Sequence, residues 1–286
     1  MEERGVPGPL PEDESVWTGH RETGLIGRPT PRASIAYRVG RLAFDILLRR
    51  IFGFRIVVQG AEHLPRTPAG RVAGGWIAAG LPHRTWVDPF VMGLALPLEP
   101  RLVFFGDGRA IFRTAWRRFW VHRIGGIIPI WVRRYAPGVE REDVMAAYVE
   151  AVRAALGAGA ILAIFPETGP PVPVDRARPL GRGIAYFALR TGAPIVPLVI
   201  GGTDVLFRGC QIIVRILPPV TGRALAGLDL TAPAPEPLSR EERLAARRLT
   251  DALHALTSPH VAEVRALAAP ARGARRRWLW LTHLWR

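Results

Sequence analysis

Short apolar runs rich in Ile and Val alternate with longer amphipathic segments through the middle of this 286-residue chain. Glycine and proline stand between most of the runs, as they commonly do between strands and helices. The alternation predicts a single α/β domain whose mixed, mostly parallel sheet is flanked by helices. The expected strands are 54–59, 71–79, 102–105, 127–132, 160–165, 195–200 and 211–217.

An amphipathic helix is expected before the first strand, over residues 34–52. Ile35, Val39, Leu42 and Ile46 recur at spacings of four, three and four residues, which places them on one helical face. Arginines occupy other faces of the same helix. The apolar stripe either packs on the sheet or lies in a membrane interface, and the sequence leaves both alternatives open.

Capping signals mark further helices. Asp88 followed by Pro89 predicts a helix with Asp88 at the N-cap and Pro89 at its first position. Ser239 and Glu242 form a capping box that starts a C-terminal helix, and Pro259 is expected to begin a second one. Two more helices are expected at 142–156 and 183–190.

Composition divides the chain into three parts. Residues 1–33 are proline-rich and are predicted to be a flexible tail, whereas 34–230 form the globular domain with its N-terminal helix. Residues 231–286 are expected to hold a proline-rich linker, a C-terminal helical segment and a basic, Trp-rich tail. Cys210 is the only cysteine, so a disulfide framework or a cysteine-based metal site within one chain is excluded.

The formal net charge is +15, and all 39 basic residues are arginines. This balance favours anionic partners such as phospholipid surfaces, phosphorylated cofactors or nucleic acid. No motif of a nucleic-acid-binding fold occurs, so a nucleic-acid partner is not expected. No stretch reaches the roughly 20 apolar residues that span a bilayer, and the N-terminus lacks a signal-peptide pattern. We therefore expect a peripheral protein at the cytoplasmic face of a membrane, with no transmembrane span.

His83 and Asp88 carry the first chemistry that the sequence indicates. Histidine is the side chain best suited to move protons near neutral pH, and such a base needs a carboxylate that fixes its tautomer and stabilises its charged form. Asp88 lies five residues after His83, across a loop and at an expected helix start. The alternative is a surface histidine beside an ordinary helix-capping aspartate, and the pair alone favours neither.

A second carboxylate, Glu167, follows the apolar run 160–165 in a turn marked by Pro166 and Gly169. Ligand-binding groups of α/β sheets gather at the carboxyl ends of strands, which makes Glu167, Thr168 and Gly169 candidates for substrate binding. A solvated carboxylate in an ordinary turn is the alternative, and for Glu167 taken alone it is the better one.

Arginines and tryptophans are interspersed between residues 109 and 134. Trp116 and Trp120 are four residues apart and can therefore share one helix face. The segment either binds phosphate and lipid headgroups or is a solvated helix whose tryptophans belong to the core. A second run, 275–280, combines three arginines with two tryptophans and favours a membrane interface over a free tail.

Four blocks follow one another in a definite order between Arg55 and Pro218. They are the H-x4-D pattern of His83 to Asp88, Arg109 before Ile111-Phe112, Phe165-Pro166-Glu167, and Gly181-Arg182-Gly183 with Ala193 to Pro197. In order and spacing, the chain resembles the glycerophospholipid acyltransferases of the 1-acylglycerol-3-phosphate acyltransferase type.

The resemblance implies a reaction. His83 would act as general base on an acceptor hydroxyl, with Asp88 orienting it, and the oxygen would attack the thioester of acyl-CoA or acyl-carrier protein. The thiolate would then leave. No metal, no further cofactor and no covalent acyl-enzyme are implied. Arg109 would bind the acceptor, a lysophospholipid or a related lipid, and Glu167 with its turn would shape the acceptor pocket.

Two departures from the family pattern concern the acceptor. Pro82 precedes His83 where the family usually has asparagine, and the sequence after Glu167 lacks the usual Gly-Thr-Arg. That arginine commonly helps to hold the acceptor phosphate, so either another arginine replaces it or the acceptor lacks a glycerol phosphate. The nearby arginines are Arg109, Arg176 and Arg178. A catalytically degenerate lipid-binding module on the same fold is the alternative function.

Overall fold

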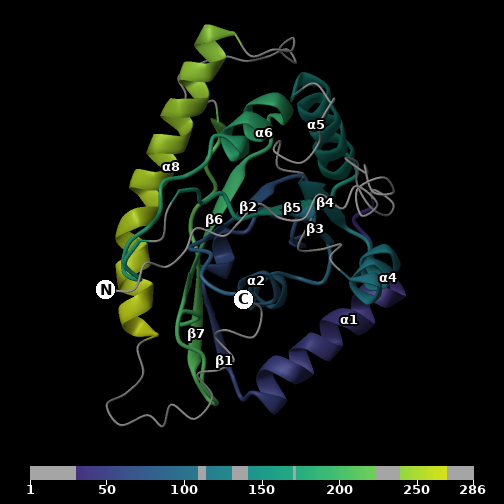
Figure 1. Cartoon of the computed structure of the whole chain (residues 1–286), viewed down its shortest axis with the longest axis vertical. Helices are drawn as coiled ribbons and strands as arrows, with labels where there is room; N and C mark the ends of the chain where they lie inside the picture. The colour runs from purple at the N-terminus through teal and green to yellow at the C-terminus, as the bar shows by residue number, and fades with distance from the viewer. Residues whose placement is uncertain (1–29, 109–113, 131–140, 170–171, 223–238, 269–286) are drawn as a thin grey trace, which may run out of the picture.

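The computed structural model describes residues 30–108, 114–130, 141–169, 172–222 and 239–268 (Figure 1). Its seven strands form one sheet in the order β1-β7-β6-β2-β5-β3-β4. All neighbouring strands are parallel except β6 and β7, so the predicted mixed, mostly parallel sheet is confirmed. The strands are β1 (Arg55–Gln59), β2 (Ile77–Leu81), β3 (Leu102–Asp107), β4 (Ile127–Ile130), β5 (Ile161–Ile164), β6 (Ile195–Gly201) and β7 (Gln211–Ile216).

Helices cover both faces of the sheet. Helices α5 (Arg141–Gly157), α6 (Gly183–Thr191) and α8 (Arg240–Leu267) pack on one face. On the other face lie α2 (Asp88–Ala95) and α1 (Ile35–Asp45), which continues as the π-helix η2 (Ile46–Ile51). Helix α4 (Ala115–Ile124) lies beside α1, on the side of the molecule away from α8 (Figure 1). A short 3-10 helix, η3 (Ala61–His63), follows β1.

The central strands lie between two hydrophobic layers, one on each face of the sheet. Every residue of β2, β5 and β6 is buried, as expected for parallel strands that are covered on both faces. Successive side chains of β2 alternate between the cores, with Ile77 and Ala79 in one and Ala78 in the other. The continuous apolar runs in the sequence result from this two-sided burial.

The predicted strand 71–79 begins six residues too early, because β2 spans Ile77–Leu81. Gly74 lies so close to Gly159 that a Cβ atom there would be 1.7 Å from the Gly159 carbonyl oxygen. The chain therefore crosses another loop at this point and becomes extended only afterwards. The other predicted strands agree with the observed ones to within two residues at each end that the structure describes.

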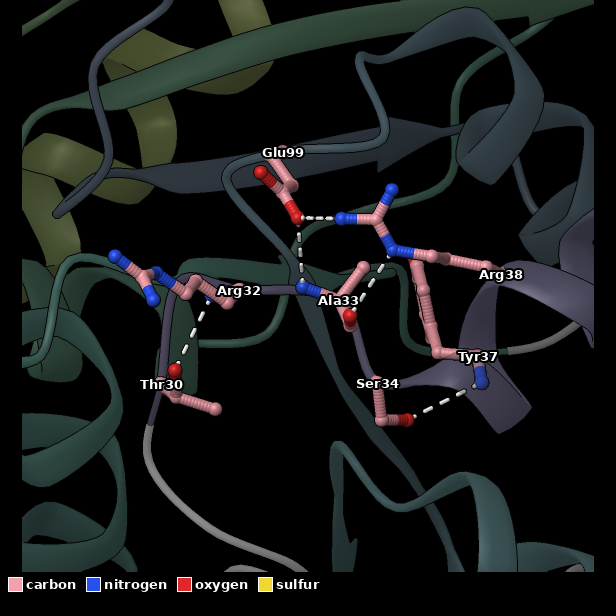
Figure 2. A network of polar contacts seen from close by, with 7 residues as sticks. All are labelled: Thr30, Arg32, Ala33, Ser34, Tyr37, Arg38 and Glu99. Carbon is pink, nitrogen blue, oxygen red and sulfur yellow. Dashed lines mark hydrogen bonds and ion pairs between the residues drawn. The ribbon is translucent and has the colours of Figure 1, made fainter.

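Helix α1 begins where the sequence predicts, and its first residues contact a distant loop (Figure 2). The Ser34 hydroxyl accepts a hydrogen bond from the Tyr37 amide at 3.2 Å, which caps the helix. Glu99, in the loop after α2, accepts one from the Ala33 amide at 3.2 Å and also pairs with the Arg38 guanidinium. These contacts fix the N-terminal end of α1 against the domain.

Helix α8 begins at the predicted capping box of Ser239 and Glu242 but does not break at Pro259. The prediction of a second helix there is wrong. Proline removes one backbone hydrogen bond, but the apolar residues on either side of it, Leu253 and Val261, are both buried. Packing of this face on the domain outweighs the lost bond, and the helix continues to Leu267.

Several sequence predictions lie outside the described residues. They concern most of the tail 1–33, the linker 231–238 and the Arg–Trp run 275–280. Within the described ranges, no helix combines the length and apolar composition needed to cross a bilayer.

Candidate active site

The candidate active site lies at the carboxyl ends of neighbouring strands β2 and β5. His83 follows the end of β2, and Glu167 follows the end of β5. Because the two strands are parallel and paired, both residues lie at the same edge of the sheet, where α/β folds usually bind ligands. The Oε2 atom of Glu167 accepts a hydrogen bond from the His83 amide at 3.0 Å, across a separation of 84 residues. The fold thus joins two motifs that are distant in sequence.

His83 and Asp88 form a hydrogen-bonded pair, with 2.9 Å between Nδ1 of the imidazole and Oδ2 of the carboxylate. The Asp88 side chain is fully buried, whereas that of His83 is 43% exposed. An ionised carboxylate can only accept hydrogen bonds, so Nδ1 carries the proton in this contact. The neutral ring therefore has its lone pair on Nε2, which can accept a proton from a bound reactant.

Two backbone amides hold the Asp88 carboxylate in place. Its Oδ2 atom accepts hydrogen bonds from the amides of Arg84 at 2.6 Å and Thr85 at 2.7 Å. The prediction of Asp88 as N-cap is wrong by one residue, because Val87 is the N-cap of α2 and Asp88 is the first helical residue. The side chain turns back to the loop amides instead of capping its own helix. It therefore fixes the loop that carries His83.

A stacked ring supports the imidazole. The Phe165 and His83 rings lie 4.4 Å apart between centroids, at an interplanar angle of 27°. The Phe165 ring in turn occupies the space above Gly80, where a Cβ atom would lie 2.5 Å from Phe165 Cε1. Gly80 in β2 is thus the position that lets this ring reach His83.

Replacing Gly80 with alanine is expected to push the Phe165 ring out of this stack. Overpacking of a core position typically costs about 1–3 kcal/mol, so we expect a loss of that order in the free energy of unfolding. Urea unfolding of the purified variant measures it. The matched control is Gly157→Ala in α5, because a Cβ atom there meets nothing within 4 Å. Equal stability of the two variants would contradict the packing argument.

Glu167, Thr168 and Gly169, the predicted substrate-binding residues, all lie at this edge of the sheet. Besides the His83 amide, Glu167 contacts the Arg178 amide, which donates to Oε1 at 3.2 Å. The amide and hydroxyl of Thr168 both reach the Pro179 carbonyl, at 2.9 and 3.3 Å. Around Gly169 the space is open. The substrate contacts of these residues stay predictions, and Arg109 lies outside the described residues.

Sequence reasoning missed three contributions to the site. They are the stacking of Phe165 on His83, the backbone amides of Arg84 and Thr85, and the hydrogen bond from the Arg178 backbone amide to Glu167. Backbone amides leave no side-chain signal in a sequence. The one available signal was Gly80, a glycine within an otherwise apolar strand, because such a residue often marks a close approach of another group.

Other reactive groups are not arranged as a centre in the part of the chain that the structure describes. No group of three or more His, Cys, Asp or Glu side chains there is placed to hold a metal ion. The Cys210 thiol lies in the core on the α2 side of the sheet, and burial raises its pKa to about 11. A thiol of this kind is not activated as a nucleophile.

The chain is thus an α/β domain with a His–Asp pair at the carboxyl edge of its sheet. A comparison of its sequence with protein families identifies the family. The family model described as Acyltransferase matches residues 55–201, just over half of the chain and the part that holds both motifs. The chain therefore belongs to the Acyltransferase family.

Among solved structures, the chain is similar to the 1-acyl-sn-glycerophosphate (LPA) acyltransferase PlsC from Thermotoga maritima. The sequence identity is 16% and the TM-score 0.49, over 83% of this chain and 80% of that one. A comparison with curated protein sequences gave no match.

Proposed function

We propose that this protein is an O-acyltransferase that moves a fatty acyl group from a thioester to a hydroxyl of a lysophospholipid or a related lipid. The thioester donor is acyl-CoA or acyl-carrier protein. Membership of the Acyltransferase family supports the reaction class. The observation that carries the proposal is the 2.9 Å contact between the half-exposed His83 ring and the buried Asp88 carboxylate.

In this mechanism the acceptor hydroxyl lies against Nε2 of His83. As the hydroxyl oxygen attacks the thioester carbonyl, its proton passes to Nε2, and the imidazolium that forms is stabilised by the Asp88 carboxylate. The tetrahedral intermediate collapses with cleavage of the carbon–sulfur bond. The thiolate takes the proton from Nε2, which returns the histidine to its starting state. The protein supplies the base and its orientation, and no covalent acyl-enzyme forms.

The test is an assay for new acylated lipids. The full chain is incubated with acyl-CoA and a lipid extract, and the products are identified by mass spectrometry while free CoA is measured. A new ester with stoichiometric release of CoA supports the proposal. Binding to vesicles without consumption of acyl-CoA or acyl-carrier protein, over a broad set of acceptors, would instead identify a lipid-binding module on this fold.

We further propose that the enzyme works at the surface of an anionic membrane, through the outer sides of α1 and α4. The apolar stripe predicted from the sequence of α1 is exposed: Ile35 by 81%, Val39 by 61% and Leu42 by 60%. On α4, the exposed large residues are Trp116 at 59%, Phe119 at 59% and Trp120 at 49%. Soluble proteins rarely expose this many large apolar side chains on adjoining helices without a partner.

The two helices are held together as one surface. The Arg101 guanidinium lies 5.1 Å from the centre of the Tyr37 ring on α1 and also donates to the Ile124 carbonyl at the end of α4. A Cβ atom on Gly40 would lie 3.3 Å from the Ile124 side chain, so the helices are in close contact. Their arginines suit an anionic bilayer, since phospholipid headgroups attract basic residues beside apolar ones. These are Arg38 on α1, Arg117, Arg118 and Arg123 on α4, and Arg49 and Arg50 on η2, which continues α1.

Replacing Trp116 and Trp120 together with serine is expected to weaken vesicle binding by about tenfold or more, because two large side chains no longer enter the interface. Co-sedimentation with vesicles containing phosphatidylserine measures the effect. Leu244→Ser is the matched control, because this residue is 47% exposed and belongs to α8, a helix that lies away from α1 and α4 (Figure 1). Equal loss of binding in the control, or none in the double variant, would argue against this surface.

A further inference from the structure

The exposed apolar side chains of α1 and α4 belong to a surface that is also strongly basic. This α1–α4 surface consists of Ile35, Val39, Leu42, Trp116, Phe119 and Trp120 together with the arginines named above. The only acidic residue in the sequences of α1, η2 and α4 is Asp45, which pairs with Arg49. Arg50 and Arg123 are exposed, and neither forms an ion pair with another described residue. The surface therefore combines apolar contact area with uncompensated positive charge.

The first part of the same chain has the complementary composition. Residues 1–29 contain six of the 24 acidic residues but three of the 39 arginines, so this part is acidic and the remainder is strongly basic. Residues 10–17, the acidic run, read Leu-Pro-Glu-Asp-Glu-Ser-Val-Trp and include no basic residue. Its three consecutive carboxylates suit arginines, and the side chains of Leu10, Val16 and Trp17 suit an apolar surface.

The described residues begin beside this surface. Figure 2 shows Thr30 to Ser34 leading directly into α1, with the Ala33 amide held by Glu99. Trp17 precedes Thr30 by thirteen residues, which span up to about 45 Å when extended, whereas α1 with η2 is about 25 Å long. The acidic run can therefore reach all of α1 and the adjoining α4.

We propose that the acidic run binds the α1–α4 surface of its own chain and is displaced from it by an anionic membrane. The inference rests on the membrane contact proposed above. Phosphatidylserine headgroups and the acidic run carry the same kind of charge, so they compete for the same arginines. A tethered segment meets its binding site at an effective concentration of about millimolar, so a weak contact is enough to cover the surface in water.

The first experiment compares wild type with the triple variant Glu12→Gln, Asp13→Asn, Glu14→Gln, in which three carboxylates become amides of the same size. Co-sedimentation uses vesicles of phosphatidylcholine with a minor fraction of phosphatidylserine. We expect the variant to bind about fivefold more tightly or more, because binding no longer requires the surface to be uncovered first. Equal binding of the two proteins would overturn the inference.

The matched control removes three carboxylates on the other face of the sheet, through Glu150→Gln in α5 with Glu241→Gln and Asp251→Asn in α8. All three side chains are exposed, so the net charge changes equally while the α1–α4 surface is untouched. Binding should stay within about twofold of wild type, because these charges lie beyond the screening length. An equal gain in the control would show that net charge alone is responsible. Thermal unfolding confirms that both variants are folded.

A disulfide test measures the contact itself, without vesicles. Cys210 is buried and its raised pKa of about 11 keeps it unreactive, so two introduced cysteines report alone. Ser15→Cys in the acidic run is combined with Ala115→Cys, at an exposed position one turn before Phe119 on α4. With oxidised glutathione, we expect this pair to close about tenfold faster or more than a control pair. Anionic vesicles should slow it.

The control pair joins Ser15→Cys with Gly157→Cys at the end of α5. Gly157 is exposed, and a Cβ atom there meets nothing within 4 Å. It is also within reach of the acidic run, because a Cβ atom on Gly159 would lie 3.7 Å from Pro31. Equal rates for the two pairs would contradict the inference. A product of twice the mass of one chain would do so as well, since it identifies a second copy as the occupant.

The two measurements also separate this inference from the proposed function. If the Ala115 pair closes selectively but wild type binds no vesicles, the contact of the acidic run stands and the membrane surface fails. If wild type binds vesicles and transfers acyl groups while both cysteine pairs close at the same rate, the proposed function stands and this inference fails.

Discussion

Replacing His83 with alanine is expected to lower kcat for acyl transfer by about a hundred- to ten-thousandfold. The reason is that Nε2 of this ring is the one proton acceptor that the Asp88 contact prepares within the described site. Without it, the acceptor hydroxyl must attack as a neutral alcohol. The KM values for donor and acceptor should change little, because the ring takes part in proton transfer rather than in binding. Initial-rate measurements with acyl-CoA give both parameters.

The matched control is His260→Ala. This histidine lies on α8 and contacts Arg215 and Glu263 on the surface, and its replacement should leave the rate within about twofold of wild type. Circular dichroism and urea unfolding confirm that both variants are folded. A His83→Ala protein that transfers acyl groups at the wild-type rate would disprove the mechanism.

Most of the fold could be predicted from the sequence because the central strands are buried on both faces. Full burial of β2, β5 and β6 produces unbroken apolar runs, which are the strongest local signal of a parallel sheet. The errors arose where tertiary packing overrides a local signal. The crossing of Gly74 over Gly159 shortened one strand, and burial on both sides of Pro259 kept α8 continuous. Both effects depend on packing partners that are distant in the sequence, so no local pattern reports them.

The site was predictable in part for a related reason. His83 and Asp88 are close in sequence, so a single loop brings them together and their spacing was informative. The contact between Glu167 and the His83 amide depends on the pairing of β2 with β5, which no local pattern specifies. The direction of the α1 stripe was also undetermined, because an amphipathic pattern does not say what covers its apolar side. The structure places that stripe on the surface.

Replacing Asp88 with asparagine is expected to lower kcat by about a hundredfold or more while the loop keeps its geometry. The amide oxygen can take the place of Oδ2 and accept from the amides of Arg84 and Thr85 and from the His83 ring. The NH2 group can take the place of Oδ1, which has no hydrogen-bond partner among the described residues. The substitution therefore removes mainly the negative charge that stabilises the imidazolium. The same initial-rate assay measures the loss.

Alanine at Asp88 provides the structural comparison. It removes the acceptor of all three hydrogen bonds and leaves two loop amides unpaired, so it should lower the free energy of unfolding by about 1–3 kcal/mol, whereas asparagine should lower it less. If asparagine destabilises the protein as much as alanine does, its effect on kcat cannot be assigned to charge.

A double substitution tests whether Asp88 acts through His83. In the His83→Ala background, Asp88→Asn should cost less than about threefold in residual rate, because a carboxylate that stabilises an imidazolium has nothing to act on when the ring is absent. Additive losses would mean that Asp88 serves the reaction separately, through the loop amides it holds. The non-additive result would establish that the two residues act as one unit, which the 2.9 Å contact and the complete burial of Asp88 lead us to expect.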